Sequence, residues 1–159
     1  MEFTTAFLSP LGFLVLKSDG TSVTEISFSE IDLPQKQSCQ VLEQCCTQLE
    51  QYFSGHLTCF SLPLAPEGTE FQQKVWTELL KIPYGETITY HELAVRLGDP
   101  KVIRAAGTAN GKNPIAIVIP CHRVIGSGNK LTGYAGGLWR KKMLLELELQ
   151  YNPNKRTLF

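Results

Sequence analysis

The feature that most constrains the fold is a change in composition at residues 65–68, which read Ala-Pro-Glu-Gly. Residues 1–70 contain two basic and nine acidic residues, a net charge of −7, whereas residues 71–159 contain thirteen basic and six acidic residues, a net charge of +7. Strand-like patterns dominate before this point and helical spacing dominates after it. We therefore predict two domains, residues 1–66 and residues 67–159, joined at this linker.

The first half has the pattern of a small antiparallel sheet followed by a helix. The strand patterns lie at residues 3–8, 11–17 and 23–28, with turns at Ser9-Pro10 and Asp19-Gly20. Residues 37–53 carry apolar side chains at helical spacing, and residues 57–64 could add another strand. This order is typical of a meander or a ribonuclease-H-like sheet.

The second half has mainly helical patterns. The expected helices begin at Thr69 and end at Ile82-Pro83, run from Thr89 through Leu97 and from Lys101 to about Asn110, and close the chain at residues 138–149. Thr89 and Glu92 have the spacing of a capping box. The two short helices joined by Gly98-Asp99 resemble a helix-turn-helix. We therefore predict an α+β protein with a helical C-terminal domain.

Composition excludes several classes of protein. No stretch approaches the roughly 20 apolar residues needed to cross a bilayer, and the N-terminus lacks a signal-peptide pattern. The cysteines match neither a disulfide framework nor a usual zinc spacing; they are Cys39, Cys45, Cys46, Cys59 and Cys121. We expect reduced thiols, no metal and no membrane partner. The protein should be a soluble monomer, cytoplasmic in a bacterium or nuclear in a eukaryote.

One short segment carries an unusual combination of reactive groups. The apolar run of residues 115–119 predicts a buried strand that ends at Pro120, and Cys121-His122-Arg123-Val124 follow directly. Neighbouring positive charge and hydrogen-bond donors lower the pKa of a cysteine and make it a nucleophile. Cys121 is therefore a candidate nucleophile. The alternative is a half-buried structural cysteine, because free cysteine usually behaves as a small hydrophobe.

Residue patterns alone leave several functions open. A cysteine hydrolase is one, with His91 or His56 as the partner of Cys121, although neither histidine lies in a telling context. A non-catalytic helix-turn-helix module is another. The helix near Arg104 is rich in small residues, which would let it lie close to a nucleic-acid groove or equally against the protein's own core. The positive half favours a polyanion as partner, unless the two halves simply attract each other.

The residues around Cys121 are nevertheless distinctive as a set. Ile119–Val124 read I-P-C-H-R-V, Asn113-Pro114 lie upstream and residues 134–138 read Y-A-G-G-L. With these motifs the chain closely resembles the O6-alkylguanine-DNA alkyltransferases, also called methylated-DNA–protein-cysteine methyltransferases. The close resemblance covers residues 69–149, and the first half fits the family in size and element order.

The resemblance implies a role for each matching catalytic residue. Cys121 would accept the alkyl group by attacking the carbon attached to guanine O6. His122, held by Glu148, would poise the thiolate through a water molecule. Asn113 would support the turn that carries the site. Tyr90 would face the base and help to protonate the departing guanine.

The resemblance also implies residues that contact DNA or the extruded base. Arg104 would fill the space left when the damaged nucleotide is flipped out of the duplex. The carbonyl of Val124, with that of the acceptor cysteine, would accept from the guanine amino group, and the amide of Ala135 would donate to O6. Tyr134 would form a pocket wall, and Arg123 would tie the two domains together.

The implied activity is a single-turnover repair reaction without a cofactor. Its partner would be double-stranded DNA that contains O6-alkylguanine or O4-alkylthymine. Ala116 stands where some relatives have a proline pocket wall, so the accepted alkyl size is open. Relatives that hold zinc use N-terminal cysteines that this chain lacks. Relatives that only bind lesions have tryptophan at the position of Cys121.

Overall fold

The computed structural model describes residues 2–152 and divides the chain into two compact units. The first unit is Met1–Glu67 with Pro114–Ala116, and the second is Gly68–Asn113 with Ile117–Phe159. The short segment joins the first unit through backbone hydrogen bonds, because the amide of Ile26 donates to Pro114 and the carbonyl of Ile26 accepts from Ala116.

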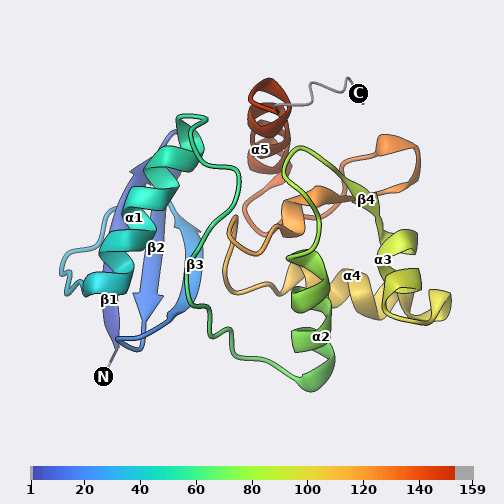
Figure 1. Ribbon diagram of the computed structural model, residues 1–159, viewed down its shortest axis with the longest axis horizontal. Coiled ribbons are helices and arrows are strands. Elements are labelled where there is room, and N and C mark those ends of the chain that lie inside the picture. The colour runs from blue at the N-terminus through green and yellow to red at the C-terminus, as the bar shows by residue number, and fades with distance from the viewer. Residues whose placement is uncertain (1, 153–159) are drawn as a thin grey trace. The chain divides into compact units, whose positions relative to one another are not determined.

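The first unit is a three-stranded antiparallel meander covered by one helix (Figure 1). Its elements are β1 (Phe3–Ser9), β2 (Gly12–Ser18), β3 (Val23–Ser29) and α1 (Gln40–Phe53). Leu14 and Leu16 of β2 and Leu42 and Leu49 of α1 are completely buried, so alternate residues of the strand and one face of the helix build the core. The three predicted strands and the helix are confirmed, with small shifts at their ends.

Two expectations for this unit are wrong in detail. Residues 57–64 form no strand, since Leu64 makes only an isolated bridge with Val23. The helix expected from residue 37 begins three residues later. Gln37 instead exchanges two backbone hydrogen bonds with Thr4, at 2.9 and 3.0 Å, and this pairing holds it in an extended conformation.

The second unit is mainly helical. Its elements are α2 (Glu70–Leu79), β4 (Ile88–Thr89), α3 (Tyr90–Arg96), η1 (Pro100–Val102), α4 (Ile103–Gly111), η2 (Cys121–Arg123), β5 (Val124–Ile125), η3 (Ser127–Asn129) and α5 (Leu138–Gln150). Thr69 caps α2 in a complete capping box. Thr89 caps α3 by accepting from the Glu92 amide, but the Glu92 carboxylate bonds Arg96 at 3.1 Å.

Helices α3 and α4 pack against each other after the turn at Gly98, whose φ of 99° is readily adopted by glycine. The helix predicted from Lys101 starts as the 3-10 turn η1, with Asp99 accepting from the Lys101 amide. A Cβ at Gly107 would make an ordinary contact with the ring of Tyr90, at 3.6 Å, so α4 lies beside the first residue of α3. Ala106 and Ala109 of α4 are buried and serve internal packing, whereas Arg104 is exposed.

The strand predicted at residues 115–119 does not form. Most of this run is buried, but Ile117 adopts a φ of 73°, a left-handed conformation that breaks an extended strand. The carbonyl of Ile119 is bonded instead by the side-chain amide of Asn113, at 2.7 Å. A strand that was not predicted, β5, follows the Cys121 turn and pairs with β4 in parallel.

Candidate active site

Cys121, His122 and Arg123 form the single 3-10 turn η2 in the second unit. The amide of Cys121 donates to the Ile119 carbonyl at 2.8 Å, and the amide of Arg123 donates to Pro120 at 3.0 Å. All three side chains are buried. A thiol, an imidazole and a guanidinium are thus held in a turn whose backbone is fixed on its upstream side.

One carboxylate, that of Glu148 on α5, joins the two basic side chains of the turn. It accepts from Nε2 of His122 at 2.7 Å and from Nε and Nη2 of Arg123 at 2.8 and 3.0 Å. Because the carboxylate can only accept, Nε2 carries the ring proton. The other ring nitrogen, Nδ1, is buried and has no hydrogen-bond partner within residues 2–152. It is therefore the nitrogen available as a base.

The loop after α2 adds hydrogen bonds to both Glu148 and Arg123. The amide of Gly85 donates to Oε1 of Glu148 at 3.2 Å, and Nη1 of Arg123 donates to the Ile82 carbonyl at 2.7 Å. Gly85 has a φ of 78°, and a Cβ there would lie 2.6 Å from the Asn152 side chain. A glycine is thus required where the backbone approaches the carboxylate.

Burial and charge act in opposite directions on the two titrating groups of this pair. Burial alone would raise the pKa of Glu148, but His122 and Arg123 hold that pKa well below its usual range. Burial, together with the charges of Arg123 and Lys141, lowers the pKa of His122 and outweighs the opposing effect of Glu148. His122 is therefore neutral in the resting protein, and the ionised Glu148 stands ready to stabilise its protonated form.

The sequence led us to expect a lowered pKa for Cys121, and the structure corrects this. Burial raises the pKa of the thiol, and this outweighs the opposing hydrogen bond from the Asn113 side chain and the charge of Lys141. The resting thiol is protonated because the residue is only 6% exposed. A base is therefore needed to generate the nucleophile.

Lys141 of α5 is a member of the site that the sequence analysis missed. Its ammonium group donates to the carbonyls of Val124 at 2.7 Å, Thr132 at 2.8 Å and Gly133 at 3.3 Å. The residue is completely buried, and no carboxylate contacts it among the residues described. Burial lowers its pKa to about 8, with an opposing contribution from Cys121. Its position in register with Leu144, Leu145 and Glu148 was the available signal.

Tyr90, the first residue of α3, lies near the sulfur and is held by two polar groups. Its hydroxyl donates to the Thr132 carbonyl at 3.0 Å, and the Lys141 ammonium lies 5.7 Å from the ring centre. Burial raises the pKa of Tyr90; hydrogen bonds with Thr132 and with the Asn110 side chain oppose the rise, while Cys121 adds to it. Asn110 of α4 is a second residue that the sequence analysis missed.

The other expected site residues fall into two groups. Val124 is buried at the start of β5, and Tyr134 is half-buried, with a pKa raised by burial and by Cys121. Arg104 and Ala135 are exposed, and within residues 2–152 neither side chain joins the Cys121 network. The Arg123 side chain donates to the Glu148 carboxylate and to the Ile82 carbonyl, and both of these residues belong to the second unit. Its expected role in tying the domains together stays a prediction.

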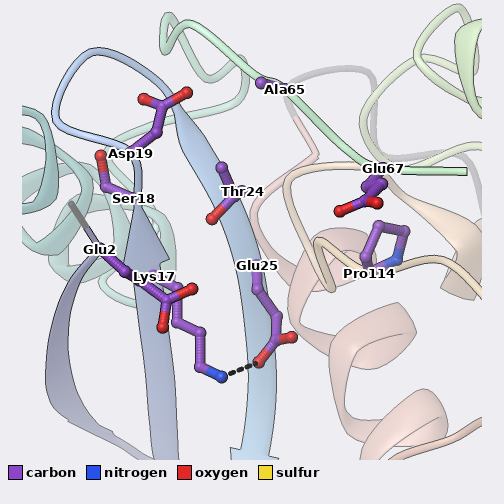
Figure 2. Close-up of a pocket in the computed structure, with 9 residues that line it drawn as sticks. All are labelled: Glu2, Lys17, Ser18, Asp19, Thr24, Glu25, Ala65, Glu67 and Pro114. Carbon is purple, nitrogen blue, oxygen red and sulfur yellow. Dashed lines mark ion pairs between the residues drawn. The ribbon is translucent and has the colours of Figure 1, made fainter.

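A separate hollow of about 700 Å³ lies in the first unit (Figure 2). Four of its nine lining residues are acidic, and its one lysine, Lys17, pairs with Glu25 at 3.6 Å. It contains none of the expected site residues. In the described part of the chain, no group of three or more His, Cys, Asp or Glu side chains could hold a metal ion. No described helix is long and apolar enough to span a bilayer.

Comparisons with known proteins agree with this arrangement. The family model "6-O-methylguanine DNA methyltransferase, ribonuclease-like domain" matches residues 3–66, and the model of the DNA binding domain of the same family matches residues 70–150. The chain is 49% identical over 148 residues to the methylated-DNA–protein-cysteine methyltransferase of Methanosarcina acetivorans, covering 89% of this chain and 95% of that protein.

Solved structures give the same result. A crystal structure of the O6-methylguanine methyltransferase of Mycobacterium tuberculosis superposes with a TM-score of 0.87, at 45% identity and over 96% of both chains. The structure of that organism's OGT in complex with DNA gives a TM-score of 0.86 with the same identity and coverage. The predicted α+β class, with a ribonuclease-like first half, is confirmed.

Proposed function

The chain belongs to the 6-O-methylguanine DNA methyltransferase family, and from this premise we propose that it repairs DNA by moving the alkyl group of O6-alkylguanine onto Cys121. The observation that carries the assignment to this residue is the buried turn in which Cys121 adjoins a histidine paired with an ionised carboxylate. The product is a stable thioether, so each molecule acts once.

Cys121 needs a base, and the geometry supports His122. Proton transfer from the thiol to Nδ1, through one water molecule, produces the thiolate as it attacks. Glu148, bonded to Nε2 at 2.7 Å, stabilises the imidazolium that results. The sulfur–carbon bond forms as the bond from that carbon to guanine O6 breaks.

The departing guanine leaves with the electron pair of the broken bond and must be neutralised. We assign Tyr90 to donate a proton to the base, because it lies close enough to Cys121 for the charge of the sulfur to raise its pKa. Lys141 and the Asn110 amide would stabilise the phenolate that forms. Return of the His122 proton to Tyr90 through solvent leaves neutral guanine and an alkylated cysteine, so charge and atoms balance.

The proposed substrate is alkylated double-stranded DNA bound by a monomer, with O4-alkylthymine as a second lesion. A base inside a duplex cannot reach a buried thiol, so it must be extruded. Arg104, exposed on α4, is assigned to fill the vacated space, and the amide of Ala135 to donate to O6. The positive charge of residues 71–159 would attract phosphates without reading sequence. The cellular location stays a prediction.

Intact-mass measurement tests this function directly. After incubation with duplex DNA containing O6-methylguanine, the protein should gain one methyl group, which peptide mapping should place on Cys121 rather than on the exposed Cys59. Cys121→Ala should abolish the gain and retain DNA binding. A cysteine hydrolase would turn over without a lasting methyl adduct. An unchanged mass at saturating lesion would overturn the proposal.

A further inference from the structure

The side chain of Asn110 occupies a position that the mechanism above leaves partly unexplained. It lies in the last turn of α4 and is only 3% exposed. Its Nδ2 atom lies 3.4 Å from the carbonyl oxygen of Cys121, as a hydrogen-bond donor. That carbonyl is one of the two expected to accept from the guanine amino group, so Asn110 contacts the backbone where the base should sit.

The orientation of this amide follows from its neighbours. The carbonyl of Cys121 can only accept, so the nitrogen of the amide must face it. The hydroxyl of Tyr90 already donates its proton to the Thr132 carbonyl, so it has no proton to offer the amide oxygen of Asn110. The amide oxygen therefore points away from the Cys121 carbonyl.

This oxygen, Oδ1, is buried and has no hydrogen-bond partner within residues 2–152. Buried side-chain acceptors without a donor are rare in native proteins, because burial removes water and gives nothing in return. The side chain is nevertheless held by the bond that its nitrogen donates to the Cys121 carbonyl. Asn110 thus holds an unused acceptor beside the expected base position.

We propose that Asn110 is a specificity-determining residue whose side-chain oxygen accepts a hydrogen bond from the exocyclic amino group of the extruded guanine. This inference rests on the proposed function and deepens it. The guanine amino group has two hydrogens; in this proposal one bonds Oδ1 of Asn110, and the carbonyls of Cys121 and Val124 share the other in a three-centre hydrogen bond. Both Asn110 and Cys121 are enclosed in the free protein, so the opening that admits a base to the sulfur brings it to the amide as well.

A cycle that changes protein and substrate together tests the contact. Transfer rates would be measured with duplexes carrying O6-methylguanine or O6-methylhypoxanthine, which lacks only the amino group, for the wild type and for Asn110→Leu. Removing the amino group should slow the wild type about tenfold more than it slows the variant, because one hydrogen bond is lost only where both partners existed. An equal slowing in both proteins would overturn the proposal.

Two controls keep the result interpretable. Thr108→Ala changes an exposed residue of the same helix and should retain the wild-type ratio. Asn110→Ser serves as a second variant if Asn110→Leu melts below the assay temperature. Like Asn110→Leu, it should lack the extra tenfold slowing on the substrate without the amino group.

Binding separates this proposal from the proposed function. In a Cys121→Ala background, the protein should still prefer the guanine lesion over the hypoxanthine lesion, and adding Asn110→Leu should reduce that preference about tenfold. This result would support the Asn110 contact even if no methyl reached Cys121 in the wild type. A preference that Asn110→Leu leaves unchanged would overturn the Asn110 contact and leave the proposed function intact.

Discussion

At the scale of single residues, the site depends on one carboxylate with several donors. Glu148 is buried, and its charge is stable there because His122, Arg123 and the Gly85 amide all donate to it. Removing one member of such a group leaves the others buried without compensation, which costs more than the group contributes as a whole. Stability and reactivity at this site are therefore linked.

We expect Glu148→Gln to destabilise the protein by about 3–5 kcal/mol, because it leaves Arg123 with an uncompensated buried charge. The variant should also slow methyl transfer, since no carboxylate remains to stabilise protonated His122. Urea unfolding followed by circular dichroism gives the first effect, and the rate of the mass gain gives the second. Glu146→Gln, an exposed partner of Lys142 at 3.9 Å, should cost under about 1 kcal/mol.

Glu148 and His122 together make the stability of the folded protein decrease at acid pH. Glu148 has a lowered pKa when folded, so its contribution is present above its unfolded pKa and is lost as the pH falls. His122 also has a lowered pKa when folded, so below about pH 6.5 the unfolded chain binds the extra proton more readily. Wild-type stability should therefore fall on acidification, and below about pH 4.5, where the glutamate of the unfolded chain takes up its proton, it should fall more steeply than that of Glu148→Gln, which lacks this group. Parallel curves would contradict the assignment of charge to Glu148.

A residue of the site could be predicted where the residues next to it in the sequence formed a recognisable motif. Cys121, His122 and Arg123 are consecutive, and the family resemblance supplied Glu148. Lys141 and Asn110 were missed, because a charged or amide side chain in a helix is usually assumed to face solvent.

At the scale of elements, α5 shows why a helix can be predicted while its buried face is not. Leu144 and Leu145 indicated an amphipathic helix, and both are buried. Lys141 and Glu148 lie on the same face as these two leucines, at i, i+3, i+4 and i+7 spacing. The apolar centre of this face therefore has a cation on one side and an anion on the other. Leu147, the next leucine along the helix, is only half-buried. Charge on the buried face marks the side of α5 that serves the site.

Lys141→Met should raise the pKa of Cys121 further, because the nearby cation that opposes the effect of burial would be lost. Transfer at neutral pH should slow about tenfold if the thiol pKa rises by about one unit. Part of the loss should be recovered at higher pH. The rate of methyl transfer measured as a function of pH tests this, with Lys142→Met, an exposed neighbour, as the control.

An unchanged pH profile in Lys141→Met, together with slower transfer at every pH, would assign Lys141 only to holding the carbonyls of Val124, Thr132 and Gly133. The shape of the profile therefore distinguishes an electrostatic role from a structural one.

The elements that sequence predicted best were those with long periodic patterns, β1 to β3 and the longer helices. The strand predicted at residues 115–119 was wrong, because apolar composition does not reveal a residue with a left-handed backbone conformation, here Ile117. The pair β4–β5 was missed because each strand has two residues, too few for a period to show.

At the scale of the whole molecule, opposite charges are divided between the two halves of the chain. The part matched by the DNA binding domain model, residues 70–150, lies almost entirely in the positive half. Composition alone could suggest a polyanion as partner, but it could not say which residue enters the duplex. To identify that residue, an experiment must distinguish a side chain that attracts phosphates from one that takes the place of the extruded base.

Arg104→Ala makes this separation experimentally. If the side chain fills the space of the extruded nucleotide, its loss should slow transfer from duplex DNA by about tenfold or more, because the unstacked state is no longer compensated. Transfer from the free base O6-methylguanine, which needs no extrusion, should be unchanged. Lys101→Ala, also exposed beside α4, should weaken duplex binding mainly at low salt and leave the rate at saturating DNA intact. Equal slowing of Arg104→Ala on both substrates would place Arg104 among the phosphate contacts or the structural residues, and another side chain would have to replace the base.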